Sequence, residues 1–169
     1  MEVFEAVRTI LAIRSYRDKP VPSDLIRRIV EAGQLTGSAM NAQPWRFVVI
    51  DERETIRRIG TLTRSGPYVA QAPLVIVVAI EKTRFAVSDG SRAIQSMMLT
   101  AWAEGVGSNW VGFVGMLDEV KPPLNIPEEV DVLAVVPFGY PSQPVGKGKK
   151  QRKPLSEIAY RGRFGQPFQ

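Results

Sequence analysis

The chain of 169 residues contains no histidine and no cysteine. Their absence excludes a Cys/His zinc site, a Ser-His-Asp or Cys-His nucleophile system, a disulfide framework and a haem bound by a proximal histidine. No metal site is therefore expected. Any catalysis must use carboxylate, lysine, serine or tyrosine chemistry, or a bound cofactor that supplies the reactive atoms itself.

Long hydrophobic runs are also lacking. The longest uncharged apolar run covers residues 72–80, far short of the roughly 20 residues that span a bilayer, so no membrane association is expected. Glu2 and Glu5 stand where a signal peptide would be basic, which predicts a cytoplasmic protein. The length, with 44% hydrophobic and 23% charged residues, is typical of a single globular domain over residues 1–169.

The net charge of +5 is unevenly distributed. From Gly146 to Arg163 the sequence holds seven basic residues and one acid, so this segment carries +6 and the rest of the chain −1. Three interpretations are open for this basic arm at about residues 141–169: a solvated tail, a phosphate site or a nucleic-acid contact. Nucleic acid is the least supported, because residues 147–153 contain no aromatic side chain on which bases could stack. The basic residues are Lys147, Lys149, Lys150, Arg152, Lys153, Arg161 and Arg163.

Hydrophobic periodicity predicts helices and strands that alternate irregularly, as in an α/β sandwich with a mixed sheet. Residues 3–13 indicate a first helix whose apolar stripe packs in the core. Residues 73–80 are apolar at every position, the pattern of a central strand covered on both faces. Asp89 is suited to cap a long helix that runs to about residue 104. Further helices are predicted at residues 23–33, 54–60, 118–120 and 155–160, and further strands at residues 45–50, 109–114 and 130–138.

The first candidate site is Arg14-Ser15-Tyr16-Arg17, directly after the first helix. Two guanidinium groups and a hydroxyl within four residues suit a phosphate, because guanidinium donates paired hydrogen bonds to phosphate oxygens. The alternative is a helix end at which basic side chains complement the helix dipole. In the basic arm, Lys150 and Arg152 form a second group that suits a phosphate.

The second candidate site is the loop at residues 36–44, which contains Ser38, Asn41 and Gln43. Hydroxyl and amide groups both donate and accept hydrogen bonds, as recognition of a ring with carbonyl and N–H groups requires. The alternative is an ordinary turn whose amides bond to the backbone. In residues 105–112 three glycines would let the backbone approach a ligand closely, although their spacing is not that of a dinucleotide-binding fingerprint.

Taken in order along the chain, these motifs resemble the FMN-dependent nitroreductase family, in the form of a short, compact member. The motifs are R-S-x-R after the first helix, an S-x-x-N-x-Q-P-W loop into a strand, G-x-G-S-x-W at a helix end, G-Y-P after a late strand and K-x-R-x-P-L near the end. The resemblance covers about residues 4–160. It implies an α+β fold with a mixed, largely antiparallel central sheet flanked by helices.

The resemblance also implies a function and a set of binding residues. The protein would be a homodimer with FMN at the interface, transferring hydride from NADH or NADPH through the flavin to a nitroaromatic, quinone or similar small-molecule acceptor by a ping-pong mechanism. No side chain would be catalytic, because the chemistry is carried by the flavin. The residues implied to bind the cofactor are Arg14, Ser15 and Arg17 at the phosphate and ribityl end, Ser38, Asn41 and Gln43 along the ribityl chain and ring, the backbone of Gly112 near the reactive flavin nitrogen, and Lys150 and Arg152 at the phosphate.

The sequence departs from the family pattern at three places around this site. Ile13 replaces the first of two arginines, Gly37 replaces a proline and Val111 replaces an acid. Arg64 is a further candidate, as a cation near the pyrimidine end of the flavin. Two other functions remain open: a specialised flavin enzyme of the same fold, dehalogenase-like or flavin-consuming, and a non-catalytic flavin-binding or nucleic-acid-binding protein that uses the basic arm.

Overall fold

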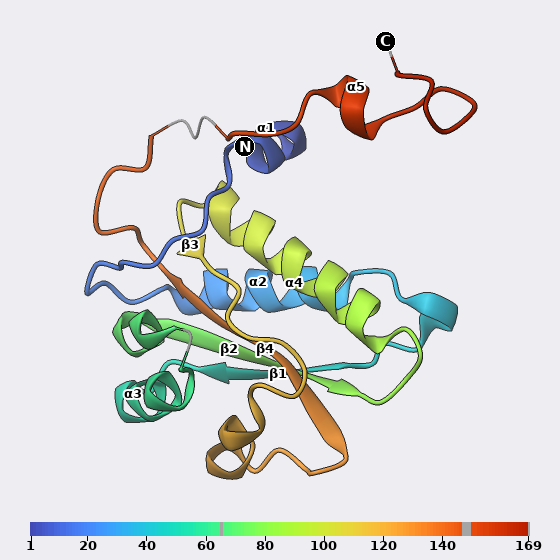
Figure 1. Ribbon diagram of the computed structural model, residues 1–169. Helices are drawn as coiled ribbons and strands as arrows, with labels where there is room; N and C mark the ends of the chain where they lie inside the picture. Colours follow the sequence, from blue (N-terminus) through green and yellow to red (C-terminus); the bar gives the residue numbers. More distant parts are fainter. Residues whose placement is uncertain (65, 147–149, 169) are drawn as a thin grey trace.

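A four-stranded antiparallel sheet forms the centre of the computed structural model, which describes residues 1–64, 66–146 and 150–168. The strand order is β1-β2-β4-β3, and the one parallel pairing among the described residues is an isolated bridge between Ala12 and Ser108. All three pairings between the strands are antiparallel, so the sheet is largely antiparallel as predicted, and the parallel bridge lies at its β3 edge (Figure 1). The strands are β1 (Trp45–Ile50), β2 (Leu74–Glu81), β3 (Gly107–Ser108) and β4 (Val130–Gly139).

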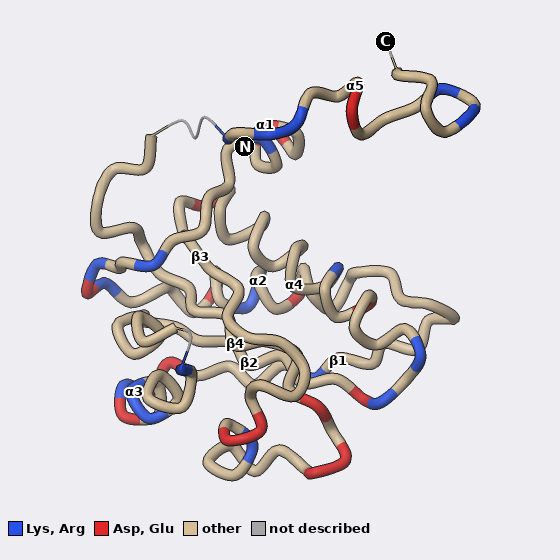
Figure 2. The backbone as a smooth tube through the Cα atoms, in the orientation of Figure 1, with Lys and Arg blue, Asp and Glu red and all other residues tan. Residues whose placement is uncertain are grey.

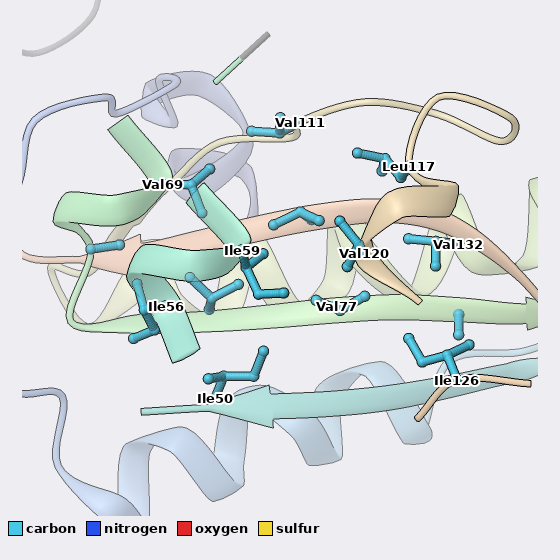
Figure 3. Close-up of a cluster of buried hydrophobic side chains, with 14 of the residues drawn as sticks. Ile50, Ile56, Ile59, Val69, Val77, Val111, Leu117, Val120, Ile126 and Val132 are labelled. Carbon is cyan, nitrogen blue, oxygen red and sulfur yellow. The ribbon is translucent and has the colours of Figure 1, made fainter. Parts of the chain in front are cut away.

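Helices cover both faces of the sheet and bury two hydrophobic clusters against it. Side chains of β2 alternate between them: Val75 and Val77 belong to the first cluster, and Ile76 and Val78 to the second. The continuous apolar run of β2 follows from this burial on both faces. α3 (Arg53–Leu62), η2 (Pro67–Gln71) and η3 (Asp118–Val120) cover the first cluster, shown in Figure 3; α2 (Ser23–Gln34) and α4 (Ala86–Ala103) cover the second.

Residues 109–114 do not form the strand that their composition predicts. The chain pairs with β4 at β3 and again at Val111, which forms an isolated bridge to Val135. Between these points the side-chain amide of Asn109 donates to the carbonyl of Trp110 at 3.1 Å. Directly after Val111, Gly112 has a φ of 75°. A local side-chain bond and a left-handed residue interrupt the regular ladder here.

Two predictions about helices also need correction. α1 (Val3–Thr9) ends earlier than predicted, and its apolar side chains Val3 and Phe4 are 76% and 78% exposed instead of packed in the core. α4 begins at Ala86, so Asp89 lies inside its first turn and is not its cap.

The basic arm leaves the body of the subunit after β4. It passes α1, forms the short helix α5 (Leu155–Ile158) and ends at the C-terminus, away from the sheet (Figure 1). Figure 2 shows basic segments along this arm and acidic segments around η3 and the start of β4. Among the described residues, no helix combines the length and apolar character needed to cross a bilayer.

Candidate functional site

Arg14, Ser15 and Arg17 lie on an exposed segment that is fixed to the end of β4. The Arg17 backbone N–H donates to the carbonyl of Tyr140 at 2.8 Å, and its side-chain Nε donates to the carbonyl of Pro141 at 2.9 Å. The hydroxyls of Ser15 and Ser142 are 2.7 Å apart. The two segments that carry R-S-x-R and G-Y-P are therefore neighbours, which sequence spacing alone could not show.

Tyr16 anchors this segment from beneath. Its side chain is buried, and its hydroxyl donates to the carbonyl of Ile13 at 2.6 Å. Burial raises the pKa of Tyr16 far above its usual range, because the charged phenolate would be poorly solvated, and the neighbouring Tyr68 adds to this shift. Tyr16 is therefore a neutral support for the residues on either side of it.

Arg14 is held by an aromatic contact that the sequence did not indicate. Its guanidinium carbon lies 5.9 Å from the ring centre of Tyr68, a cation–π arrangement. The Tyr68 hydroxyl in turn is hydrogen bonded to the side-chain amide of Asn109. Within the described part of the chain, no acid forms an ion pair with Arg14. Its charge is thus available to an anion.

Ser38, Asn41 and Gln43 share a tight loop that contains η1 (Ala39–Asn41). The Ser38 Oγ accepts a hydrogen bond from the Gln43 backbone N–H at 2.9 Å, and the Gln43 side-chain amide donates to the carbonyl of Asn41 at 3.2 Å. The side chains of Asn41 and Gln43 are exposed. The loop brings these three predicted residues together and leaves polar groups facing outward.

Gly112 occupies a position that favours glycine for two reasons. Its φ of 75° lies in the left-handed region, and a Cβ built there would come within 2.6 Å of Leu117. Its carbonyl accepts from the indole N–H of Trp110 at 2.6 Å. Nearby, the Ser108 hydroxyl is buried and has no hydrogen-bond partner among the described residues.

Lys150 and Arg152 lie beside α1. The Lys150 Nζ donates to the carbonyl of Val7 at 2.7 Å, and Arg152 donates to the carbonyl of Gln151 at 2.8 Å. Burial, together with the positive charges of Arg152 and Arg8, lowers the pKa of Lys150. Lys153 is exposed, whereas Lys147 and Lys149 lie outside the described residues.

Arg64 is placed differently from its predicted role. Its guanidinium forms an ion pair with Glu119 at 2.9 Å, and 85% of its side chain is exposed. No contact of this residue with the other candidate residues is found within the described ranges. A cavity of about 520 Å³ lies elsewhere, between α1 and residues 140–146, and Arg17 is part of its lining.

The two main groups of candidate residues do not converge within the chain. The Arg17 backbone N–H donates to the carbonyl of Tyr140, just beyond the last residue of β4. The Pro44 carbonyl accepts from the backbone N–H of Glu81, and Glu81 pairs with the first residue of β4. Ten residues of strand separate these points, a distance of about 30 Å. Figure 1 shows the two segments at opposite ends of the sheet, residues 14–19 in blue and residues 36–44 in cyan. One mononucleotide cannot contact both groups in the same subunit.

The fold and the motifs place the chain in a class of α+β proteins, and the chain can be compared with known members of that class. The pattern of the nitroreductase family matches residues 8–82 and 64–140 of this chain. A putative NADH dehydrogenase/NAD(P)H nitroreductase of Methanothermobacter thermautotrophicus is 35% identical over 154 residues, with 86% of this chain and 81% of that protein covered. The chain belongs to the nitroreductase family.

More distant relatives carry more specific names. The FMN reductase [NAD(P)H] of Bacillus subtilis is 25% identical, with 93% of this chain and 72% of that protein covered. An iodotyrosine deiodinase of Thermotoga neapolitana is 27% identical, with 88% and 90% covered. The crystal structure of a putative NADH dehydrogenase/NAD(P)H nitroreductase from Parabacteroides distasonis has a TM-score of 0.86 at 22% identity, covering 96% of this chain and 98% of that one. This last likeness concerns the fold.

Proposed function

We propose that the protein is an FMN-dependent oxidoreductase that uses NADH or NADPH to reduce a small electrophilic acceptor such as a nitroaromatic or a quinone. The observation that carries the proposal is the group of Arg14, Ser15 and Arg17: cations and a hydroxyl on one exposed segment, with no acid paired to Arg14 in the described residues. This donor set fits a phosphate. Family membership and the named relatives support the flavin and the electron donor.

Each group of residues has a separate task in this proposal. Arg14, Ser15 and Arg17 bind the phosphate and the adjacent ribityl end, and Lys150 and Arg152 add positive charge at the phosphate. Ser38, Asn41 and Gln43 bind the ribityl chain and the ring. The backbone N–H of Gly112 would donate a hydrogen bond to the ring. These residues orient the cofactor by charge and hydrogen bonding.

The reaction needs no acid–base side chain from the protein. A bound flavin supplies the hydride acceptor and donor atoms itself, which is consistent with a chain that has no histidine and no cysteine. The protein's part is to hold the ring, to leave one face open for the nicotinamide and the acceptor in turn, and to supply N–H and cationic groups that favour negative charge on the reduced ring. Alternate use of one face corresponds to a ping-pong mechanism.

We infer further that each site is shared by two copies of the chain. The distance of about 30 Å between the ends of β4 separates Arg17 from Gln43 in one subunit. A partner copy could supply the loop at residues 36–44 to the Arg14 group of its neighbour. The exposed apolar side chains of α1 and the arm, among them Phe4 at 78% and Phe164 at 91%, support association.

A second candidate function has a specific basis. The iodotyrosine deiodinase relative makes a reductive dehalogenase of the same fold the main alternative among flavin enzymes. A panel of nitroaromatic, quinone, free flavin and halotyrosine acceptors, assayed with NADH and with NADPH, separates these activities. The acceptor with the highest kcat/KM identifies the class.

The first test is whether the purified protein binds FMN. We expect a yellow preparation with flavin absorbance, and a Kd measured by flavin fluorescence that rises in Arg14→Ala and in Arg152→Ala. The loss of a charge-assisted contact should cost about 1.5–3 kcal/mol of binding free energy. A colourless protein that binds no added FMN contradicts the proposal, and unchanged titrations for both variants would mean that the phosphate lies elsewhere. Deletion of residues 146–169 tests the nucleic-acid alternative. If that alternative is right, the shortened protein keeps FMN and loses a nucleic-acid binding that weakens steeply with salt.

A further inference from the structure

The loop that carries Ser38, Asn41 and Gln43 has an unfavourable backbone. Met40, Asn41 and Gln43 have φ values of 52°, 55° and 48°, in the left-handed region where a Cβ atom crowds the backbone. The side chain of Met40 is 90% exposed, so its burial does not offset this strain. Residues in such conformations persist only where surrounding contacts enforce them.

The middle of the loop is joined to α4 by a buried carboxylate. Its bonds between Ser38 and Gln43, and between Gln43 and Asn41, fix its internal shape. Its two ends are held by the Thr36 hydroxyl, which donates to the Ser96 hydroxyl at 2.8 Å, and by the Pro44 carbonyl, which accepts from the Glu81 N–H at 2.9 Å. The Ala39 backbone N–H reaches outside the loop and donates to the two oxygens of Asp89, at 3.1 and 3.3 Å. Asp89 is fully buried in the first turn of α4, which gives this bond a rigid base.

The role of Asp89 within α4 does not account for a buried charge. The helix begins at Ala86 with Phe85 at the N-cap position, and the Asp89 N–H makes an ordinary helical bond to Phe85. The carboxylate forms an ion pair with Arg92, whose side chain is 55% exposed. A buried ion pair is weak evidence for stability, because apolar residues of similar volume are often as stable. What a carboxylate adds at this position is an acceptor for the Ala39 N–H.

We propose that Asp89 is a positioning residue for cofactor recognition. By holding Ala39 it places Ser38, Asn41 and Gln43 at a fixed distance from the end of the sheet, although it contacts no ligand itself. The inference rests on the proposed flavin function, since the loop is the part of that site that would recognise the ribityl chain and ring. It also explains why the loop tolerates three left-handed residues without a glycine among them.

The test compares variants that keep or remove the acceptor. Asp89→Asn retains a carbonyl oxygen for the Ala39 N–H, whereas Asp89→Leu and Asp89→Ala do not. The test requires only that one of these last two variants folds. Ile56→Ala is the matched control, because Ile56 is fully buried in the cluster on the opposite face of the sheet. For each variant, Tm, the Kd for FMN and the visible circular dichroism at saturating FMN are measured.

We expect the variants without an acceptor to bind FMN at least about tenfold more weakly and to change the circular dichroism of the bound flavin, whereas Asp89→Asn stays within about threefold of the wild type. Ile56→Ala should lower Tm and leave Kd and the flavin spectrum unchanged. The proposal is overturned if a folded Asp89→Leu or Asp89→Ala protein binds FMN like the wild type, or if Asp89→Asn is as weak as they are.

A separate measurement distinguishes failure of this inference from failure of the proposed function. Amide hydrogen exchange at Ala39 reports the bond without any ligand. Faster exchange in Asp89→Leu than in Asp89→Asn supports the anchoring of the loop even if the wild type binds no FMN, in which case the flavin function alone is wrong. Equal exchange in the two variants contradicts the anchoring itself.

Discussion

Lys150 provides a test of the phosphate site at the scale of one residue. Its pKa is lowered by burial and by Arg152 and Arg8, so its positive charge is lost at a lower pH than that of an exposed lysine. A phosphate binds the protonated amine, and FMN affinity should therefore fall as the pH rises through this pKa. We expect the Kd for FMN to increase by up to about tenfold between pH 7.5 and 10.5, measured by fluorescence titration.

Lys150→Arg is the matched variant for this experiment, because a guanidinium keeps its charge throughout that pH range. Its FMN affinity should fall less steeply above pH 8, whereas Lys150→Ala should bind weakly at every pH. The flavin itself titrates in all three proteins, so the difference in slope between lysine and arginine is the informative quantity. Parallel slopes in the wild type and Lys150→Arg would remove Lys150 from the phosphate site.

At the same scale, the sequence predicts which types of residue form the site, but not the contacts that hold them in place. The order of the motifs was sufficient to indicate the family, and it named the arginines, serines and amides as candidates. The contact of Arg14 with Tyr68, and of Tyr68 with Asn109, joins segments about fifty residues and about forty residues apart, and no local pattern contains that information. Asp89 was assigned to a helix cap because local rules consider only its own helix.

At the scale of elements, the strongly periodic segments agree with prediction. β1 spans the predicted residues 45–50, and α2 (Ser23–Gln34) covers the helix predicted at residues 23–33 and extends one residue further. The failures concern segments whose local pattern is overridden by contacts or exposure that the pattern does not contain. Residues 109–114 have strand composition, but the Asn109 amide and the left-handed Gly112 interrupt the ladder. The sequence predicts the apolar stripe of α1, yet Val3, Phe4 and Val7 in that stripe are exposed.

The start of α3 provides a stability prediction at this scale. The Glu52 carboxylate accepts from the Thr55 hydroxyl and from the backbone N–H groups of Glu54 and Thr55. These bonds lower the pKa of Glu52, the Thr55 side chain contributing most. A lowered folded-state pKa means that the cap stabilises the protein at neutral pH and that this stability is lost as the pH falls below the ordinary glutamate value.

Glu52→Ala should therefore lower Tm by about 2–4 °C at pH 7, and the difference from the wild type should shrink at pH 3 and below. Differential scanning calorimetry across this range measures both effects. Glu54→Ala is the control, because Glu54 is exposed in the same turn and its carboxylate takes no part in the cap. A loss of Tm that is independent of pH would mean that the carboxylate charge does not contribute.

At the scale of the whole molecule, three observations have one explanation. The Arg14 group and the loop at residues 36–44 lie at opposite ends of β4. α1 exposes Val3 and Phe4, and the arm ends in exposed aromatic side chains. A monomer leaves all three unexplained, whereas the proposed symmetric pair would bury the apolar groups and would bring the arginines of one copy to the amides of the other.

Subunit mixing tests this arrangement directly. Arg14→Ala damages one half of the proposed site and Asn41→Ala the other, so each homodimer should have two weak sites. In a heterodimer one site takes both native groups and the other takes both substitutions. After random exchange about a quarter of all sites should recover wild-type FMN affinity, seen as a tight phase in a fluorescence titration that is absent from either variant alone. If native mass spectrometry shows heterodimers but mixing restores no tight phase, both groups act within one subunit. If size-exclusion chromatography at micromolar concentration shows a monomer that holds FMN, the proposal of a shared site is wrong.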